Sequence, residues 1–225
     1  MPTITFLGHA AISIEHDGKT VLVDPFLTGN PKAAASADEV AADAILLTHG
    51  HGDHYGDTVP IAKRTGAQVV AITEIAGEIA EEGIEANDVN IGGTAEYDWG
   101  SVQLTPAFHT STTPKGTVTP PAGLVIEFGD KRIYHLGDTA LFSDLALPKR
   151  RGRLDVALVC IGGHYTMDRY DAVIACDFIE ADRVIPCHYN TFPAVETDVQ
   201  AFKVDVDRDT PSEVVILEPG ETHDA

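Results

Sequence analysis

The sequence has few of the residues that would assign it to several common classes of protein. Only three of its 225 residues are cysteine, Cys160, Cys176 and Cys187, and their spacing does not match a cysteine metal site. An odd number of cysteines also gives no disulfide framework, so we expect all three thiols to be reduced and buried. No apolar run approaches the roughly 18 residues that suggest a membrane-spanning helix.

Basic residues are also scarce. Lysine and arginine total 15 against 35 aspartates and glutamates, which gives a formal net charge of −20 at pH 7. Such a field repels nucleic acids and anionic membrane surfaces, so we expect neither as a partner. The one dense basic cluster is KRRGR, Lys149 to Arg153. We interpret it as a solvated loop, and a contact for an anionic substrate is the alternative.

The first residues, MPTITFLGHA, lack the basic and apolar regions of a secretory signal peptide. We therefore expect the protein in the cytoplasm, which also suits reduced cysteines. The expected partner is a small-molecule substrate, and association into a homo-oligomer is left open.

The remaining composition is that of an ordinary globular protein, with 44% hydrophobic and 22% charged residues. No stretch looks like a linker, so we expect one domain over residues 1–225. Short strands come first, and strands then alternate with helices. Helices are predicted at Thr58–Arg64, Glu74–Glu82, Asp168–Ile179 and near Val199. This order predicts an α/β fold with two sheets covered by helices.

The segment Ala44 to Asp57, AILLTHGHGDHYGD, carries the clearest chemical signal. An apolar strand runs directly into the pattern H-x-H-x-D-H, formed by His49, His51, Asp53 and His54. Imidazole and carboxylate groups together suit zinc and similar divalent ions. Alternate residues of a tight loop point to one side, so the first two histidines can reach one ion. The aspartate and the last histidine can then face a second ion.

Three further potential ligands follow predicted strands elsewhere in the chain. They are His109 after VQLTPAF, Asp138 after RIYHLG and His188 after RVIPC. Functional residues of layered α/β folds collect at strand ends, so we expect all three to converge on the histidine-rich loop.

Several motifs along nearly the whole chain match a known family. They are Gly8-His9-Ala10, Asp24 to Leu27 (DPFL), the H-x-H-x-D-H loop, Leu136 to Thr139 (LGDT), Gly162 to Met167 (GGHYTM) and His188 to Pro193 (HYNTFP). In these motifs the chain resembles the metallo-β-lactamase superfamily. It is most similar to the short single-domain metal-dependent hydrolases related to ascorbate-6-phosphate lactonase. The resemblance implies a four-layer αββα sandwich with a dinuclear metal site at one edge.

The resemblance also implies a division of the ligands between two divalent metal ions. The first would be held by His49, His51 and His109. The second would be held by Asp53, His54 and His188. Asp138 would bridge the two ions, since an anionic carboxylate offsets part of the repulsion between cations roughly 3.5 to 4 Å apart. Zinc is the expected metal, while manganese, iron and nickel also accept these ligands.

The remaining motif residues receive supporting roles. A hydroxide shared by the ions would attack a carbonyl carbon or a phosphorus atom, with Asp53 orienting it. His164 is predicted to contact substrate or donate a proton, and a purely structural role is the alternative. His9 is placed at the rim of the site. Asp24 and Asn190 are predicted to support ligand histidines, as outer partners do in most metal sites.

These observations predict a metal-dependent hydrolase of a small ester, lactone or phosphodiester. One alternative is a phosphodiesterase or nuclease acting on nucleotides. Another is a metal-binding sensor module without catalysis, which would bind metal and turn over nothing. Flavin-linked diiron oxidoreductases of the same superfamily typically have Glu where this chain has His51, so redox chemistry is disfavoured.

Overall fold

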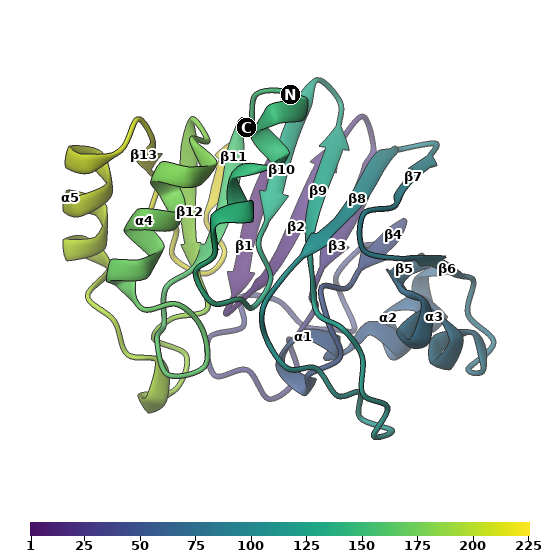
Figure 1. The fold of residues 1–225 in the computed structure, drawn as a ribbon. Helices are drawn as coiled ribbons and strands as arrows, with labels where there is room; N and C mark the ends of the chain where they lie inside the picture. Colours follow the sequence, from purple (N-terminus) through teal and green to yellow (C-terminus); the bar gives the residue numbers. More distant parts are fainter.

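The computed structural model describes all residues, 1–225, as two mixed seven-stranded sheets packed face to face with helices on both outer sides. Figure 1 shows the two sheets crossing the middle of the molecule, with α4 and α5 on one side and α2 and α3 on the other. This arrangement confirms the predicted α/β sandwich of four layers.

The first sheet has the strand order β14-β1-β2-β3-β4-β5-β6. Strands β14 to β3 pair antiparallel, and β3 to β6 pair parallel. The bounds are β1 Thr3–Gly8, β2 Ala11–His16, β3 Lys19–Val23, β4 Ala44–Leu46, β5 Gln68–Ile72, β6 Ala86–Val89 and β14 Thr222–Asp224.

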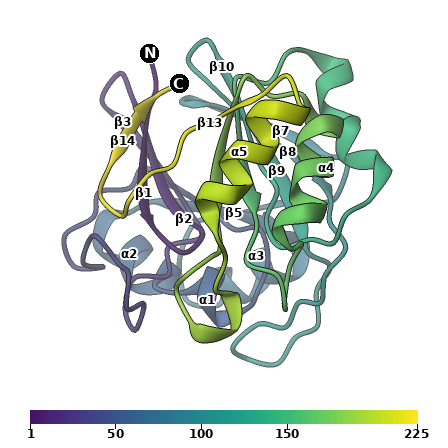
Figure 2. The same ribbon diagram turned by 90° about the vertical axis from the view of Figure 1, so that its left-hand side faces the viewer.

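The second sheet has the order β13-β12-β11-β10-β9-β8-β7. In Figure 1, chain order runs from left to right in the first sheet, β1 to β6, and from right to left in the second, β7 to β13. Its strands β7 to β10 pair antiparallel, and β10 to β13 pair parallel. The bounds are β7 Thr94–Tyr97, β8 Gly100–Pro106, β9 Ala122–Phe128, β10 Lys131–His135, β11 Val156–Cys160, β12 Arg183–Cys187 and β13 Glu213–Val214. Figure 2 shows the last strand, β14, returning beside β1, so both chain ends lie at the edge opposite α1.

Four of the five helices, α2 to α5, occupy predicted places, whereas α1 forms within the histidine-rich loop, where no helix was predicted. The helix bounds are α1 Gly52–Tyr55, α2 Thr58–Thr65, α3 Thr73–Ala80, α4 Arg169–Ile179 and α5 Val199–Asp209. Three short 3-10 helices lie in the loops of the second half of the chain: η1 Ser143–Ala146 and η2 Pro148–Arg151 between β10 and β11, and η3 Pro193–Val195 between β12 and α5. Helix α4 begins at a side-chain cap, because Asp168 accepts hydrogen bonds from the backbone N–H groups of Tyr170 and Asp171. Helix α3 ends at Ala80, earlier than predicted, because the chain turns before Gly83.

Some edge elements differ from the sequence-based prediction. The apolar segment 213–218 (EVVILE) predicts a strand, but it pairs only at Glu213–Val214. Strands β6 (ANDV) and β14 (THD) were not predicted, because both are short and rich in polar residues. The three cysteines are free and buried, as expected.

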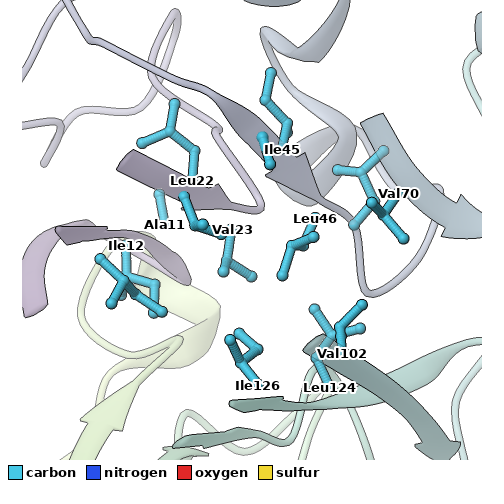
Figure 3. Packing of buried hydrophobic residues seen from close by; sticks show 14 of the residues in the cluster. Ala11, Ile12, Leu22, Val23, Ile45, Leu46, Val70, Val102, Leu124 and Ile126 are labelled. Atoms are coloured by element: carbon cyan, nitrogen blue, oxygen red, sulfur yellow. The ribbon is translucent and has the colours of Figure 1, made fainter. Parts of the chain in front are cut away.

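The main core lies between the two sheets. Figure 3 shows Val23 and Leu46 of the first sheet pointing toward Val102, Leu124 and Ile126 of the second. Their neighbours Leu22 and Ile45 point to the opposite face, as alternation along a strand requires. A second cluster of buried residues lies between the second sheet and helices α4 and α5. No helix is long and apolar enough to cross a membrane.

Leu46 offers a test of this core. Its side chain is fully buried at the end of β4. Leu46→Ala is expected to lower the free energy of unfolding by about 2–5 kcal/mol, through lost burial and a residual cavity. Denaturant unfolding measures the change. The control Val118→Ala, at a side chain 79% exposed, should stay within about 0.5 kcal/mol of the unsubstituted protein. Equal effects of the two substitutions would contradict the assignment of Leu46 to the core.

Candidate metal centre

All the predicted metal ligands follow the carboxyl ends of strands at one edge of the sandwich. The histidine-rich loop follows β4 of the first sheet. His109, Asp138 and His188 follow β8, β10 and β12 of the second sheet. Figure 1 shows this edge at the bottom, where α1 lies between the two layers. Ligands from distant parts of the sequence therefore meet because both sheets direct these strands to the same edge.

Two glycines allow the histidine-rich loop to fold tightly. Gly56 ends α1 with a positive φ of 42°, and a Cβ there would lie 2.5 Å from the carbonyl oxygen of Pro25. Gly50 lies against Thr113, and its backbone N–H donates to Ser111 Oγ at 3.0 Å. The long loop after His109 therefore rests on the histidine-rich loop and fixes its position.

The ligand atoms form three overlapping groups, within each of which all atoms lie within 4.8 Å of one another. One group is His49, His51 and His109. A second is His9, Asp53, His54 and His188. The third is His49, His54 and Asp138. The structure thus brings together all seven predicted ligands, and it adds His9 to them.

Asp138 occupies the centre of this cluster and is 3% exposed. Its Oδ2 lies 3.2 Å from His188 Nε2 and 3.5 Å from His109 Nε2. The same oxygen is 4.0 Å from His49 Nε2, and Oδ1 is 3.3 Å from His54 Nε2. One carboxylate therefore faces imidazoles from two of the ligand groups.

Several of these buried polar atoms have no hydrogen-bond partner. Such atoms are costly unless something else satisfies them. They are His54 Nε2, Asp138 Oδ1 and both ring nitrogens of His188. A divalent cation accepts lone pairs from such nitrogen and oxygen atoms, so the donor set fits a metal of the zinc type.

Asp24 orients two of the histidines. Its Oδ2 lies 2.7 Å from His54 Nδ1 and accepts the hydroxyl of Thr48 at 2.6 Å. Thr48 Oγ1 lies 3.0 Å from His49 Nδ1. Because each Nδ1–H donates to an oxygen, both Nε2 lone pairs are directed toward the ligand cluster. Asp24 thus has the contacts of the predicted supporting carboxylate, and Thr48 extends its effect to His49.

The carboxylates raise the affinity of two imidazoles for protons. Burial alone would lower the pKa of His54, but the adjacent Asp138 and Asp24 carboxylates raise it well above its ordinary value. Burial likewise opposes a charge on His188, yet Asp138 raises the pKa of His188 to about 9. Conversely, burial would raise the pKa of Asp138, and the facing histidines hold it well below the usual range.

His9 is buried beside Asp53 instead of lying at the rim. Its Nε2 lies 3.1 Å from Asp53 Oδ2, and its Nδ1 lies 2.9 Å from Thr191 Oγ1. Since a carboxylate only accepts, Nε2–H donates to Asp53 and Nδ1 accepts from Thr191. His9 has a positive φ of 61°, and its ring centroid is 4.0 Å from that of His188. His9 therefore supports Asp53 in a fixed orientation.

Substitutions of His9 test this role. His9→Gln keeps a donor near the position of Nε2, whereas His9→Leu removes it. We expect His9→Leu to weaken metal binding by roughly 10–100-fold, the effect typical of lost outer partners, and His9→Gln to recover most of that loss. Titration with zinc under a competing chelator measures both. Equal affinity in the two variants would show that the hydrogen bond to Asp53 does not matter.

Two other predicted site residues lie away from the ligand cluster. His164 is exposed, and its ring packs edge-on against Tyr165 with centroids 4.4 Å apart. The side chain of Asn190 bonds to the backbone of Thr197, accepting its N–H at 2.8 Å and donating to its carbonyl at 3.2 Å. Asn190 therefore holds the loop after His188 and touches no ligand.

A cavity of about 520 Å³ opens onto the ligand cluster. Its polar side includes Asp53, His109 and Asp138. Its apolar side includes Tyr165 and Phe192, neither of which sequence analysis selected as a site residue. Tyr165 belongs to the GGHYTM motif and Phe192 to the HYNTFP motif, and this membership is the sequence signal that could have identified them as site residues. The cavity is large enough for a small-molecule substrate.

Comparisons with known proteins agree with this geometry. A family model described as a β-lactamase superfamily domain matches residues 3–188. A UPF0173 metal-dependent hydrolase of Bacillus thuringiensis subsp. konkukian is 46% identical over 205 residues, which cover 88% of this chain and 90% of that protein.

Solved structures give the same result. Igni18, a metallo hydrolase from the archaeon Ignicoccus hospitalis, superposes with a TM-score of 0.90 at 36% identity, covering 99% of this chain and 97% of that one. The metallo-β-lactamase fold protein YhfI of Bacillus subtilis has a TM-score of 0.76 at 13% identity, covers both chains completely and supports the fold alone. The chain therefore belongs to the β-lactamase superfamily, within which it is a metal-dependent hydrolase of the metallo-β-lactamase fold.

Proposed function

We propose that the site holds two divalent metal ions and hydrolyses a small ester, lactone or phosphodiester. The observation that carries this proposal is the position of Asp138, whose carboxylate oxygens lie within 4.0 Å of an imidazole nitrogen of each of His49, His109, His54 and His188. The first two histidines belong to one ligand group and the last two to another. A carboxylate so placed can bridge two cations, with His51 completing the first ligand set and Asp53 the second. Zinc is the proposed metal, because imidazole and carboxylate ligands predominate.

When bound, such ions lower the pKa of water toward neutrality and polarise the oxygen under attack. The residues of the chain then have separate tasks. The side chain of Asp53 lines the cavity and is one-third exposed, while His9 donates a hydrogen bond to its Oδ2. It can therefore accept a hydrogen bond from the attacking water and hold its proton at a carboxylate oxygen.

The leaving group faces the segment Gly162 to Met167. Tyr165 lines the cavity there, and His164 stands beside it in solvent. We assign His164 to the mouth of the cavity, where it contacts substrate or donates a proton to the leaving group. For an ester, water adds to the carbonyl carbon, the C–O bond to the alcohol breaks, and a carboxylic acid and an alcohol are released.

A substrate panel tests the proposal. Zinc-loaded protein is assayed on a lactone, a thioester, a carboxylic ester, a phosphodiester and a β-lactam. Turnover of an ester, a lactone or a phosphodiester that stops with a chelator and returns with zinc would support the proposal. Metal bound at full occupancy without turnover of any member would favour a sensor module instead. Asn190→Ala, which touches no ligand, serves as a matched control for metal content.

A further inference from the structure

The cavity lining has no permanently charged basic side chain, although substrates of hydrolases are often anionic. None of the residues that line it is lysine or arginine, and two of them, Asp53 and Asp138, are acidic. A charged substrate group lying away from the metal ligands would lose hydration there without gaining a partner. The chemistry of the lining therefore disfavours an anionic group at this position.

The lysines and arginines of the chain form contacts away from this cavity. Of the 15 lysines and arginines, 11 pair with carboxylates, and Arg64 donates to backbone carbonyls. Lys32 lines a different cavity, Arg151 lines another beside η2, and Arg150 is exposed on that same helix. The basic cluster at Lys149 to Arg153 therefore supplies no contact to the cavity at the ligand cluster.

The apolar side of the cavity is built rigidly. Asn190 N–H donates to the carbonyl of Val195 at 2.8 Å, and Val195 N–H donates to that of Phe192 at 3.0 Å. Val195 is fully buried, and a Cβ at Gly162 would lie 2.9 Å from its Cβ. The Gly162 backbone therefore lies close to the Val195 side chain, and this packing fixes the short helix η3 and holds Phe192 beside the cavity.

Two aromatic rings at the cavity are left exposed to solvent. Phe192 is 36% exposed and Tyr165 is 60% exposed. Phe192 packs on one side against the His9 ring, with centroids 5.6 Å apart. Aromatic faces at the mouth of a cavity offer apolar contact area to a ligand. Exposed apolar patches on a protein surface often mark ligand-binding sites.

We propose, on the basis of the function proposed above, that the substrate carries an uncharged apolar acyl or aryl group, which binds between Tyr165 and Phe192. The ester or lactone carbonyl then faces the ligand cluster. This preference favours neutral carboxylic esters and lactones over phosphodiesters and over substrates with a distal carboxylate or phosphate.

A pair of esters of similar size tests the preference in catalysis. Zinc-loaded protein is assayed on 4-nitrophenyl butyrate, which is neutral, and on mono-4-nitrophenyl succinate, which ends in a carboxylate. We expect kcat/KM for the butyrate to be at least about tenfold higher, the scale of discrimination that pocket contacts supply. Equal or faster hydrolysis of the succinate would overturn the inference and leave the proposed function standing.

A binding measurement separates the inference from catalysis. Acetophenone and 4-acetylbenzoate are a neutral ketone and its carboxylate analogue, and neither is hydrolysed. Saturation-transfer NMR on zinc-loaded protein should detect acetophenone, with its signal reduced in Phe192→Ala, and should detect 4-acetylbenzoate more weakly. If no ester, lactone or phosphodiester of the substrate panel is hydrolysed either, but this binding preference holds, the proposed function fails and the inference survives. Stronger binding of 4-acetylbenzoate would refute the inference.

A charge substitution gives the complementary result. Phe192→Lys should shift the ratio of the two esters toward the succinate by about tenfold, because it adds a cation at the cavity wall. Val204→Lys adds the same charge on α5, at a side chain 62% exposed, and controls for the change in net charge. An equal shift in the two variants would assign the preference to the overall field of the protein instead of to the cavity.

Discussion

Replacing Asp138 with alanine is expected to lower metal occupancy and activity together. This carboxylate is buried at the centre of the ligand cluster and lies close to four histidines. Without it, two cations would have no carboxylate between them, and Asp53 would be the one remaining carboxylate among the proposed ligands. We expect hydrolysis to fall by more than about 100-fold, the upper end of the losses seen for outer partners. Metal analysis of the purified variant should show fewer bound ions.

Asp57→Asn is the matched control for Asp138→Ala. Asp57 belongs to the same loop, but its Oδ2 accepts backbone N–H groups of Leu27 and Thr28 at 2.9 and 2.7 Å and contacts no ligand. Its substitution should reduce the free energy of unfolding by about 1–3 kcal/mol and leave the metal content unchanged. Full activity in Asp138→Ala would refute the two-metal proposal.

Removal of metal is expected to destabilise the protein, and more strongly at high pH. At a free metal concentration a thousand times the dissociation constant, binding stabilises the fold by about 4 kcal/mol. For a chain of this length that corresponds to a decrease in Tm of roughly 10 °C when a chelator is added. Differential scanning calorimetry measures this decrease.

The pH dependence follows from the histidines. Despite burial, the Asp138 carboxylate raises the pKa of His188 to about 9 in the metal-free fold, above the ordinary histidine value of 6.5, so protonation of His188 stabilises that fold fully below pH 6.5. This stabilisation is lost as the pH rises toward 9, and His54 acts in the same direction. Metal ions bind the neutral imidazoles, so their affinity increases over the same range. The difference in Tm between loaded and chelated protein should therefore grow from pH 6 to pH 9. A constant or shrinking difference would show that these two histidines do not hold metal.

The features that could be predicted from sequence are local ones. The ligand loop could be recognised because a buried strand, two small residues and four donor groups lie within a few positions of one another. His109, Asp138 and His188 could be added because each follows a strand, and strand ends share an edge. The layers of the fold follow from the alternation of strands and helices. These inferences use local sequence patterns and do not require the order of the strands within each sheet.

The rest depends on contacts between distant segments. Thr191 touches His9 from 182 positions away, and although it lies in the HYNTFP motif, nothing in the sequence pairs it with His9. His164 was selected over Tyr165, yet His164 adopts a left-handed conformation with φ of 51°, and the tyrosine next to it lines the cavity. Asn190 was expected to support a ligand, but its side chain closes a turn with Thr197. Backbone conformation of this kind is not encoded in residue type alone.

The two sheets are built from successive parts of the chain, and this arrangement has a consequence for engineering. The chain completes six strands of the first sheet before it enters the second near Gly92, and only β14 returns. A break at Gly92 would give one fragment with His49, His51, Asp53 and His54 and another with His109, Asp138 and His188. Neither fragment holds a complete set of ligands, so metal ions bound by residues of both fragments would hold the two fragments together. Metal binding would therefore favour recombination of the two pieces, which is the property that a metal-dependent split reporter needs.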